Sequence, residues 1–223
     1  MNLIKSTGTF SIFVIISRVL GYFRDVLIAI YLGSGPIADA FFVAFRIPNT
    51  FRRLFAEGSF NAAFVPSYSS ELATKRNNAK RFANDVFNIL ILGLLILIVI
   101  IEIFMPTFIY LIAPGFYEDQ SKLELTTLLT RITFPFLLFI SLASFFSAIL
   151  NSHNRFAVAS AAPIILNLLL IGVLFYGNYL DDKLVYYLSY AVTIAGFLQL
   201  LLLYFFVKKF YSPLLSFKIN FDK

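Results

Sequence analysis

The chain has 223 residues, of which 60% are hydrophobic and 13% are charged, and its mean hydropathy is +0.85. Soluble domains carry about 25% charged residues, so this composition indicates an integral membrane protein with a single helical bundle. The absence of cysteine excludes a disulfide framework and a thiolate metal site, and one histidine leaves little for imidazole catalysis, so no catalytic residue, metal or cofactor is expected. The net charge of +6 is not taken as a sign of nucleic-acid binding, because in a membrane protein the positions of the charges matter more than their sum.

The predicted elements are membrane-spanning helices. Each apolar segment exceeds the ~20 residues that cross a bilayer core. The first is not typical of a signal peptide, because charged residues interrupt it and no small-residue cleavage site follows. A polar segment at 66–86 is expected to be a cytoplasmic loop, and 208–223 a C-terminal tail. The six expected spans cover about 7–32, 37–65, 87–112, 123–150, 156–176 and 184–207.

The charges of the connecting segments predict the orientation. With alternating spans, one face carries Lys5, Lys75, Arg76, Lys80, Arg81, Arg155, Lys208, Lys209, Lys218 and Lys223. The other face has only Lys122 and Lys183, beside several acidic residues. Lys and Arg accumulate on the cytoplasmic side, so both termini are expected there.

Charged residues are concentrated in the first two expected spans, between positions 17 and 59. An ionised side chain in hydrocarbon costs at least ~2.5 kcal/mol, so these groups need a watery cavity, one another or a charged ligand. At helical spacing Arg18 and Asp25 share a stripe of the first span, with Ser17 and Arg24 beside it. The charged residues are Arg18, Arg24, Asp25, Asp39, Arg46, Arg52, Arg53 and Glu57.

In the second span, Asp39, Arg46, Arg53 and Glu57 share one face if the helix is continuous. Pro48 leaves that continuity open, because a proline removes one backbone hydrogen bond and clashes with the carbonyl four residues earlier.

Two interpretations of the charged residues are open. They neutralise one another in a structural cluster, or they bind a ligand. Five arginines against three acids leave a net positive charge, which favours an anionic ligand. The planar guanidinium binds phosphate oxygens through two parallel bonds, so a phosphorylated and amphiphilic substrate is predicted.

Several motifs carry a resemblance to a known family. They are S-R-V-L-G-Y-F-R-D, D-A-F-F-V-A-F-R-I-P-N, R-R-L-F-A-E-G-S-F, A-F-V-P, A-P-G-F, I-T-F-P-F-L-L-F-I-S-L-A-S and A-I-L-N-S-H-N-R-F. In these motifs the chain resembles the MurJ (MviN) family of bacterial lipid II flippases, within the MOP superfamily of transporters. The similarity covers essentially the whole chain but only the N-terminal lobe of the family's two pseudo-symmetric lobes.

The resemblance implies an all-α membrane lobe in the bacterial inner membrane. It implies movement of lipid II, an undecaprenyl-diphosphate-linked peptidoglycan precursor, from the inner to the outer leaflet by alternating access of two lobes, without ATP hydrolysis. Matching family positions imply substrate binding by Arg18, Arg24, Asp25, Asp39 and Arg52, and a gate or cavity role for Ser17, Arg46, Arg53 and Glu57. The family's other cavity arginines lie in the second lobe.

Other classes of function remain open from the sequence. The chain could be another flippase or an antiporter of the same superfamily, although its arginines argue against an antiporter of cations. A membrane enzyme acting on polyprenyl diphosphates would carry an acidic metal-binding cluster in a cytoplasmic loop, and none is seen. A fragment without autonomous transport is compatible with all of these. The expected partners are lipid II, membrane lipids, and either a separate C-terminal lobe or a second copy of the chain.

Two further expectations concern single residues. His153 is expected to be a solvated loop residue and not a ligand. Gly93, Gly172 and Gly196 are expected to allow close packing of helices.

Overall fold

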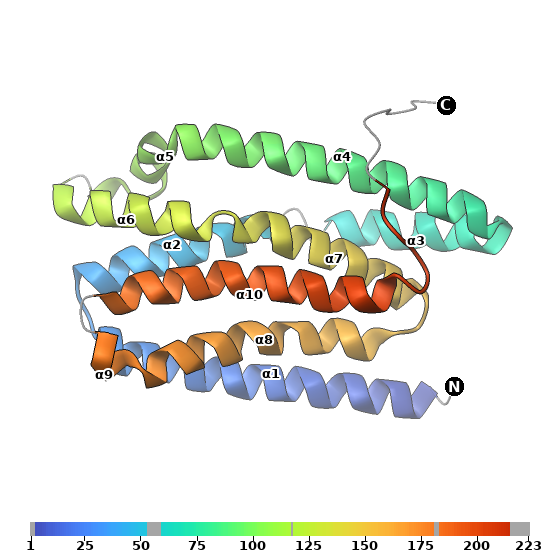
Figure 1. Ribbon diagram of the computed structural model, residues 1–223, viewed down its shortest axis with the longest axis horizontal. Coiled ribbons are helices and arrows are strands. Elements are labelled where there is room, and N and C mark those ends of the chain that lie inside the picture. The colour runs from blue at the N-terminus through green and yellow to red at the C-terminus, as the bar shows by residue number, and fades with distance from the viewer. Residues whose placement is uncertain (1–2, 53–58, 117, 181–182, 215–223) are drawn as a thin grey trace.

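The computed structural model describes residues 3–52, 59–116, 118–180 and 183–214, and all regular structure in these ranges is helical. Long helices lie side by side in one bundle, and the turns between them lie at its two ends (Figure 1). The elements are α1 (Leu3–Leu32), α2 (Pro36–Arg52), α3 (Ser59–Thr74), α4 (Arg76–Ile103), α5 (Met105–Ile112), η2 (Pro114–Phe116), α6 (Gln120–Thr133), α7 (Phe136–Ser152), α8 (Phe156–Phe175), α9 (Gly177–Leu180) and α10 (Leu184–Val207).

Four helical stretches in the described ranges are long and apolar enough to cross a membrane, namely α4, α6 with α7, α8 and α10. α1 has 30 residues but carries the charges described above, and α2 and α3 have 17 and 16 residues. The expected all-helical membrane fold is confirmed. The number of spans stays a prediction.

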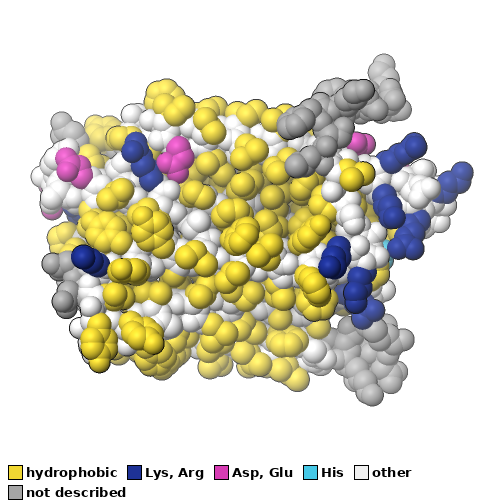
Figure 2. All heavy atoms as spheres, in the orientation of Figure 1, with side chains coloured by type: hydrophobic (Ala, Val, Ile, Leu, Met, Phe, Trp, Pro, Cys, Tyr) yellow, Lys and Arg dark blue, Asp and Glu magenta, His cyan; other side chains and the backbone are white. Residues whose placement is uncertain are grey.

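The helices alternate in direction. α1, α4 and α8 run away from the end at which the N-terminus lies, whereas α2 and α3, α6 and α7, and α10 run back towards it (Figure 1). Basic side chains gather at this end, which we call the basic end (right in Figure 2). Its described basic residues are Lys75, Arg76, Lys80, Arg81, Arg155, Lys208 and Lys209.

Two helix interruptions lie next to prolines, because a proline lacks the N–H that continues the helix. α4 ends before Phe104, and Pro106 lies in the first turn of α5. α6 ends at Thr133, and α7 begins immediately after Pro135. The third and fourth expected spans are therefore each built from two helical pieces.

Pro48 does not break α2. Its ring leaves the carbonyl of Ala44 without the usual backbone donor. The buried hydroxyl of Thr133 in α6 donates to this carbonyl at 2.8 Å. A hydrogen bond between two helices thus replaces the one that proline removes, and the continuity that the sequence left open is resolved in favour of an unbroken helix up to Arg52.

The segment expected to be a loop at 66–86 is helical, with its only described interruption at Lys75, whose backbone is extended. This segment packs as helix because it has an apolar face within a polar sequence. Tyr68, Ala79 and Ala83 are fully or almost fully buried, and Phe64 stacks on the ring of Phe82 with the centroids 5.7 Å apart. This face packs α3 and the start of α4 against α7.

The sequence suggested that His153 is a solvated loop residue, but its side chain is partly buried. Its ring stacks on Phe210 with the centroids 4.2 Å apart, and its Nε2 lies 3.2 Å from the hydroxyl of Tyr68. Burial, and secondarily the charge of Arg76, lower the pKa of His153 below its usual value of 6.5.

The expectation that glycines allow close packing of helices holds at one of the three positions. A Cβ added to Gly196 in α10 would lie 2.6 Å from Cδ2 of Phe136, so only glycine allows α10 to approach α7 this closely. A Cβ on Gly93 or Gly172 would meet nothing within 4 Å. Close packing therefore explains Gly196 and not the other two.

Candidate functional site: a polar face on α1 and α2

Arg24 lies where α1, α2 and α8 meet. Its Nε and Nη2 donate to Oδ1 of Asp25 at 2.9 and 2.6 Å, and its Nη1 donates to Oδ1 of Asn167 in α8 at 2.8 Å. The guanidinium carbon also lies 5.6 Å from the ring centroid of Phe45 in α2. A side chain with these partners has one fixed orientation, and three of its five N–H donors are used.

Asn167 connects this arginine to the backbone of α1. Its Nδ2 donates to the carbonyl of Ser17 at 2.9 Å while its Oδ1 accepts from Arg24. Asn167 is only 5% exposed, and its amide would lie 3.7 Å from a Cβ at Gly21, so α1 and α8 are in close contact at this point. The buried amide of Asn167 thus holds α1 against α8 and helps to fix the orientation of Arg24.

Ser17 and Arg18 contribute to a cavity of about 380 Å³ between α1, α3, α7, α8 and α10. Its other polar lining residues are Asn61, Ser144, Ser147, Asn151, Ser160 and Gln199.

Three of these lining side chains have a buried atom without a hydrogen-bond partner among the described residues: Asn61 Oδ1, Asn151 Oδ1 and Gln199 Nε2. A buried polar atom without a partner is unfavourable, so the cavity is suited to water or to another polar group.

Asp39 lies in the first turn of α2, and its carboxylate pairs with Nζ of Lys122 at 2.6 Å. Lys122 is in α6 and also lies 4.0 Å from the ring centroid of Phe116. The described ion pair of Asp39 is therefore with α6 and not with an arginine of α1.

The remaining predicted site residues lie further along α2. Arg46 is exposed, and with Asp39 and the exposed Phe42 it shares one helical face. Arg52 is the last residue of α2, and its side chain lies outside the described part of the structure, as do residues 53–58, which include Arg53 and Glu57.

The predicted site residues thus separate into three places. Arg24 and Asp25 lie together at the junction with α8, Ser17 and Arg18 line the cavity, and Asp39 is paired with α6. No group of three or more His, Cys, Asp or Glu side chains that could hold a metal ion occurs in the described ranges.

Sequence reasoning missed Asn167 and the amides of the cavity. The signal was present, because an amide within an otherwise apolar helix at membrane depth is costly and usually has a partner. Asn167 and Gln199 each interrupt such a segment in α8 and α10. Their partners were not evident, since Arg24 and Asn167 are 143 positions apart.

The chain was compared with known proteins. The family model described as lipid II flippase MurJ matches residues 28–223. A probable lipid II flippase MurJ from Rhizobium tropici is 45% identical over 93% of this chain and 40% of the relative, and one from Rickettsia prowazekii is 40% identical over 94% and 41%. The lipid II flippase MurJ from Burkholderia cenocepacia is 36% identical over 90% of this chain and 39% of its own length.

A solved structure shows the same likeness. It is described as lipid II flippase MurJ in an inward closed conformation, is 28% identical, and superposes with a TM-score of 0.76 over 95% of this chain and 43% of that protein. The chain spans about 40% of the length of the curated relatives it matches. With a family model that matches most of its length, this chain belongs to the lipid II flippase MurJ family.

Proposed function

We propose that this chain forms one lobe of a lipid II flippase, with six spans and both termini on the cytoplasmic side of the bacterial inner membrane. The gathering of basic residues at one end supports the orientation, since cytoplasmic segments are rich in Lys and Arg. The beginning of α1 and the end of α10 lie at the same end of the bundle, which supports an even number of crossings.

The observation that carries the proposal is the exposed polar face of α1. Arg18 is exposed, and the side chain of Asp25 is 63% exposed, on a helix long enough to cross the bilayer. Facing hydrocarbon, each charge would cost at least ~2.5 kcal/mol. This face therefore needs an opposite wall that encloses water or a charged ligand. A second lobe would supply that wall, and the relatives are long enough to contain one.

Arg24 is the residue we assign to the diphosphate of the lipid-linked substrate. Its orientation is fixed by Asp25 and Asn167, and two of its donors are not used in these contacts. A preoriented guanidinium binds phosphate oxygens at a smaller entropic cost than a free side chain does. Arg18 and Arg46 add positive charge on exposed surfaces.

Transport by alternating access needs two bodies that move about a shared site. The chain supplies one body, and the second body is a C-terminal lobe or a second copy of the chain. In this mechanism the exposed faces of α1 and α2 form half of the substrate pathway. Arg52 contributes to substrate binding, and Ser17, Arg46, Arg53 and Glu57 contribute to the cavity or gate.

The test is complementation of a bacterial strain depleted of its lipid II flippase. The chain is expressed alone, and then with the C-terminal part of a full-length relative. Rescue by the pair and not by either part alone is expected. Rescue by the chain alone would show that two copies suffice. If membrane-inserted pairs failed to rescue while the intact relative did so, the proposal would be wrong.

A further inference from the structure

The cavity beside Ser17 and Arg18 contains polar groups that the proposed diphosphate site at Arg24 does not use. Small side chains of α7 and α8 leave a space of about 380 Å³ there, which larger side chains would fill. Three polar residues of α7 share one helical face towards it, namely Ser144, Ser147 and Asn151. The small lining residues are Ala143, Ser144, Ser147, Ala159, Ser160 and Ala162.

Buried polar atoms from three helices indicate that this cavity takes a ligand. Gln199 in α10 is only 2% exposed, and its Nε2 has no hydrogen-bond partner among the described residues. On two other walls, Oδ1 of Asn61 in α3 and Oδ1 of Asn151 in α7 also lack a partner in the described ranges. A buried donor or acceptor without a partner is unfavourable. The cavity therefore suits a group that accepts hydrogen bonds from Gln199 and donates them to the two asparagines.

The charge of the lining restricts the kind of ligand. Arg18 is the only charged residue among the described lining residues, so a cation would meet repulsion without a compensating carboxylate. A simple anion would face the unpaired amide oxygens of Asn61 and Asn151. Hydroxyl and amide groups both donate and accept, so they match the lining. Such groups are the polar groups of an N-acetylated sugar.

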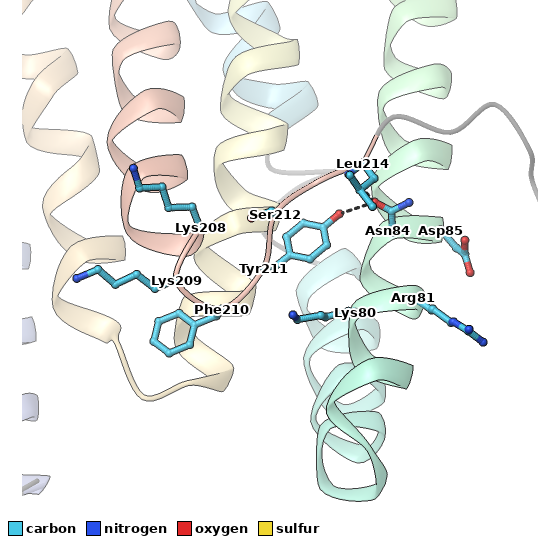
Figure 3. A pocket seen from close by; sticks show the side chains of 10 residues that line it. All are labelled: Lys80, Arg81, Asn84, Asp85, Lys208, Lys209, Phe210, Tyr211, Ser212 and Leu214. Atoms are coloured by element: carbon cyan, nitrogen blue, oxygen red, sulfur yellow. Dashed lines mark hydrogen bonds between the residues drawn. The ribbon is translucent and has the colours of Figure 1, made fainter.

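A larger groove at the basic end lacks this convergence. It measures about 740 Å³ and lies between α4 and segment 208–214, where the hydroxyl of Tyr211 donates to Oδ1 of Asn84 at 3.2 Å (Figure 3). Its charged side chains are exposed, and Lys80 and Arg81 extend in different directions. The groove at the basic end therefore gives no reason to assign a ligand.

The cavity and Arg24 lie along the same face of α1. Phe10, Val14 and Ser17 line the cavity at helical spacing, and the same stripe continues through Gly21 to Arg24. Seven residues of helix separate Ser17 from Arg24, a rise of about 10 Å. A group attached to a diphosphate at Arg24 is therefore near enough to enter the cavity. Phe10, which is 41% exposed, offers a ring on which the C–H groups of a sugar can pack.

We infer that this cavity binds a neutral, N-acetylated sugar that is attached to the diphosphate of the lipid-linked substrate. Gln199 donates to an oxygen of the sugar, and Asn61 and Asn151 accept from its hydroxyl or amide groups. The inference rests on the proposed function, in which Arg24 binds the diphosphate. It adds a separate subsite, built by five helices of this chain alone.

The test compares two lipids that differ only in the sugar. Native mass spectrometry of the purified chain in detergent measures the binding of undecaprenyl diphosphate and of the same lipid carrying one N-acetylglucosamine. The lipid with the sugar is expected to bind about tenfold more tightly, the effect of one or two hydrogen bonds. Equal affinities, including no detectable binding of either lipid, would overturn the inference. Complete lipid II is the third ligand. A gain that appeared only with lipid II would assign the cavity to the peptide, and would also overturn the inference.

Gln199→Met tests the subsite directly. It keeps the approximate shape of the side chain and removes a buried amide whose Nε2 has no partner to lose, so the fold should not be destabilised. We expect the preference for the sugar-carrying lipid to fall by roughly three- to tenfold, with the affinity for undecaprenyl diphosphate unchanged. An unchanged preference would show that the cavity holds only water, and an equal loss for both lipids would show a general effect on the fold. Either result would overturn the inference.

The matched control is Ser189→Ala. Ser189 is buried in the same helix but outside the cavity, and its hydroxyl donates to the carbonyl of Val185 at 2.9 Å. This variant should keep the full preference for the sugar-carrying lipid. A loss equal to that in Gln199→Met would contradict the assignment to the cavity.

Arg24→Ala separates this inference from the proposed function. It should weaken the binding of both lipids and leave the preference between them, because the two groups bind at different places. Undiminished binding of both lipids would refute the diphosphate assignment of Arg24 and leave the sugar subsite standing. Loss of the preference alone would place the sugar at Arg24 and overturn the inference.

Discussion

Asn167 in α8 accepts a 2.8 Å hydrogen bond from Arg24 in α1 and so helps to orient this guanidinium. Its second bond, to the carbonyl of Ser17, ties the same amide to the helix that carries the arginine. Of the two residues that orient Arg24, Asn167 is therefore the neutral one and comes from a different helix, whereas Asp25 also pairs with its charge.

Replacing Asn167 tests this relationship. Asn167→Ala removes one hydrogen bond to a charged group, and we expect a loss of transport of about tenfold or more when the chain is paired with a second lobe. Asn167→Asp should be more harmful, because a second carboxylate beside Arg24, in addition to that of Asp25, would give the group a net negative charge that repels an anionic substrate. Lipid II translocation in proteoliposomes is the measurement, with the exposed Asn78→Ala as control. Equal activity of all three variants would contradict an orienting role.

A second prediction concerns the hydrogen bond that replaces the one lost at Pro48. Thr133→Val leaves the carbonyl of Ala44 buried and unpaired, at a cost of about 1–3 kcal/mol in stability. The measurement is thermal unfolding of the purified chain in detergent. Thr127→Val is the matched control, because that hydroxyl bonds the carbonyl of Leu123 within its own helix.

The same bond can be tested by a double replacement. Pro48→Ala restores the backbone donor to Ala44, so Thr133→Val should cost little in that background. A cost that stayed the same would show that the Thr133 hydroxyl stabilises the protein in another way.

The helices could largely be predicted from the sequence, because hydrophobic runs of this length have few alternatives. α10 covers the same residues, 184–207, as the sixth expected span. The helical nature of 66–86 was missed, since its buried face consists mainly of single small or aromatic residues such as Ala79 and Tyr68, separated by polar ones.

The candidate site was only partly predictable. The charged stripe of α1 follows from helical periodicity alone. The partners of Asp39 and Arg24 do not, because Lys122 and Asn167 lie 83 and 143 positions away and only the packing of helices brings them together.

Gly196 offers a packing test with an internal control. Gly196→Ala would place a methyl group 2.6 Å from Phe136, and such overpacking costs about 1–3 kcal/mol. Gly172→Ala has open space and should be neutral or slightly stabilising, because alanine favours helix. Thermal unfolding of both variants provides the comparison. A Gly196→Ala variant as stable as Gly172→Ala would show that α7 and α10 can separate freely.

The half-buried His153 predicts a loss of stability on acidification. Its pKa is lowered in the folded protein, so the unfolded state binds the proton more readily. The stabilising contribution is complete above the unfolded pKa of about 6.5 and is lost as the pH falls from there towards the folded pKa. Melting temperatures are compared at about pH 7.5 and 5.5, a range in which histidine is the main side chain to titrate. His153→Gln, which does not titrate, should reduce the difference, and an unchanged difference would rule out this residue as the cause.

The orientation of the lobe can be tested without altering any native thiol, because the chain has no cysteine. Asn78 lies at the basic end in the first turn of α4, whereas Glu118 precedes α6 at the opposite end, and both are exposed. In the proposed orientation the basic end lies in the cytoplasm. A membrane-impermeant maleimide added to intact cells should therefore label Glu118→Cys, and should label Asn78→Cys only after the membrane is opened. The opposite pattern would invert the topology and place the basic end outside the cell. Labelling of both in intact cells would show that the two ends are not separated by the membrane, so that the six-span lobe would have to be abandoned.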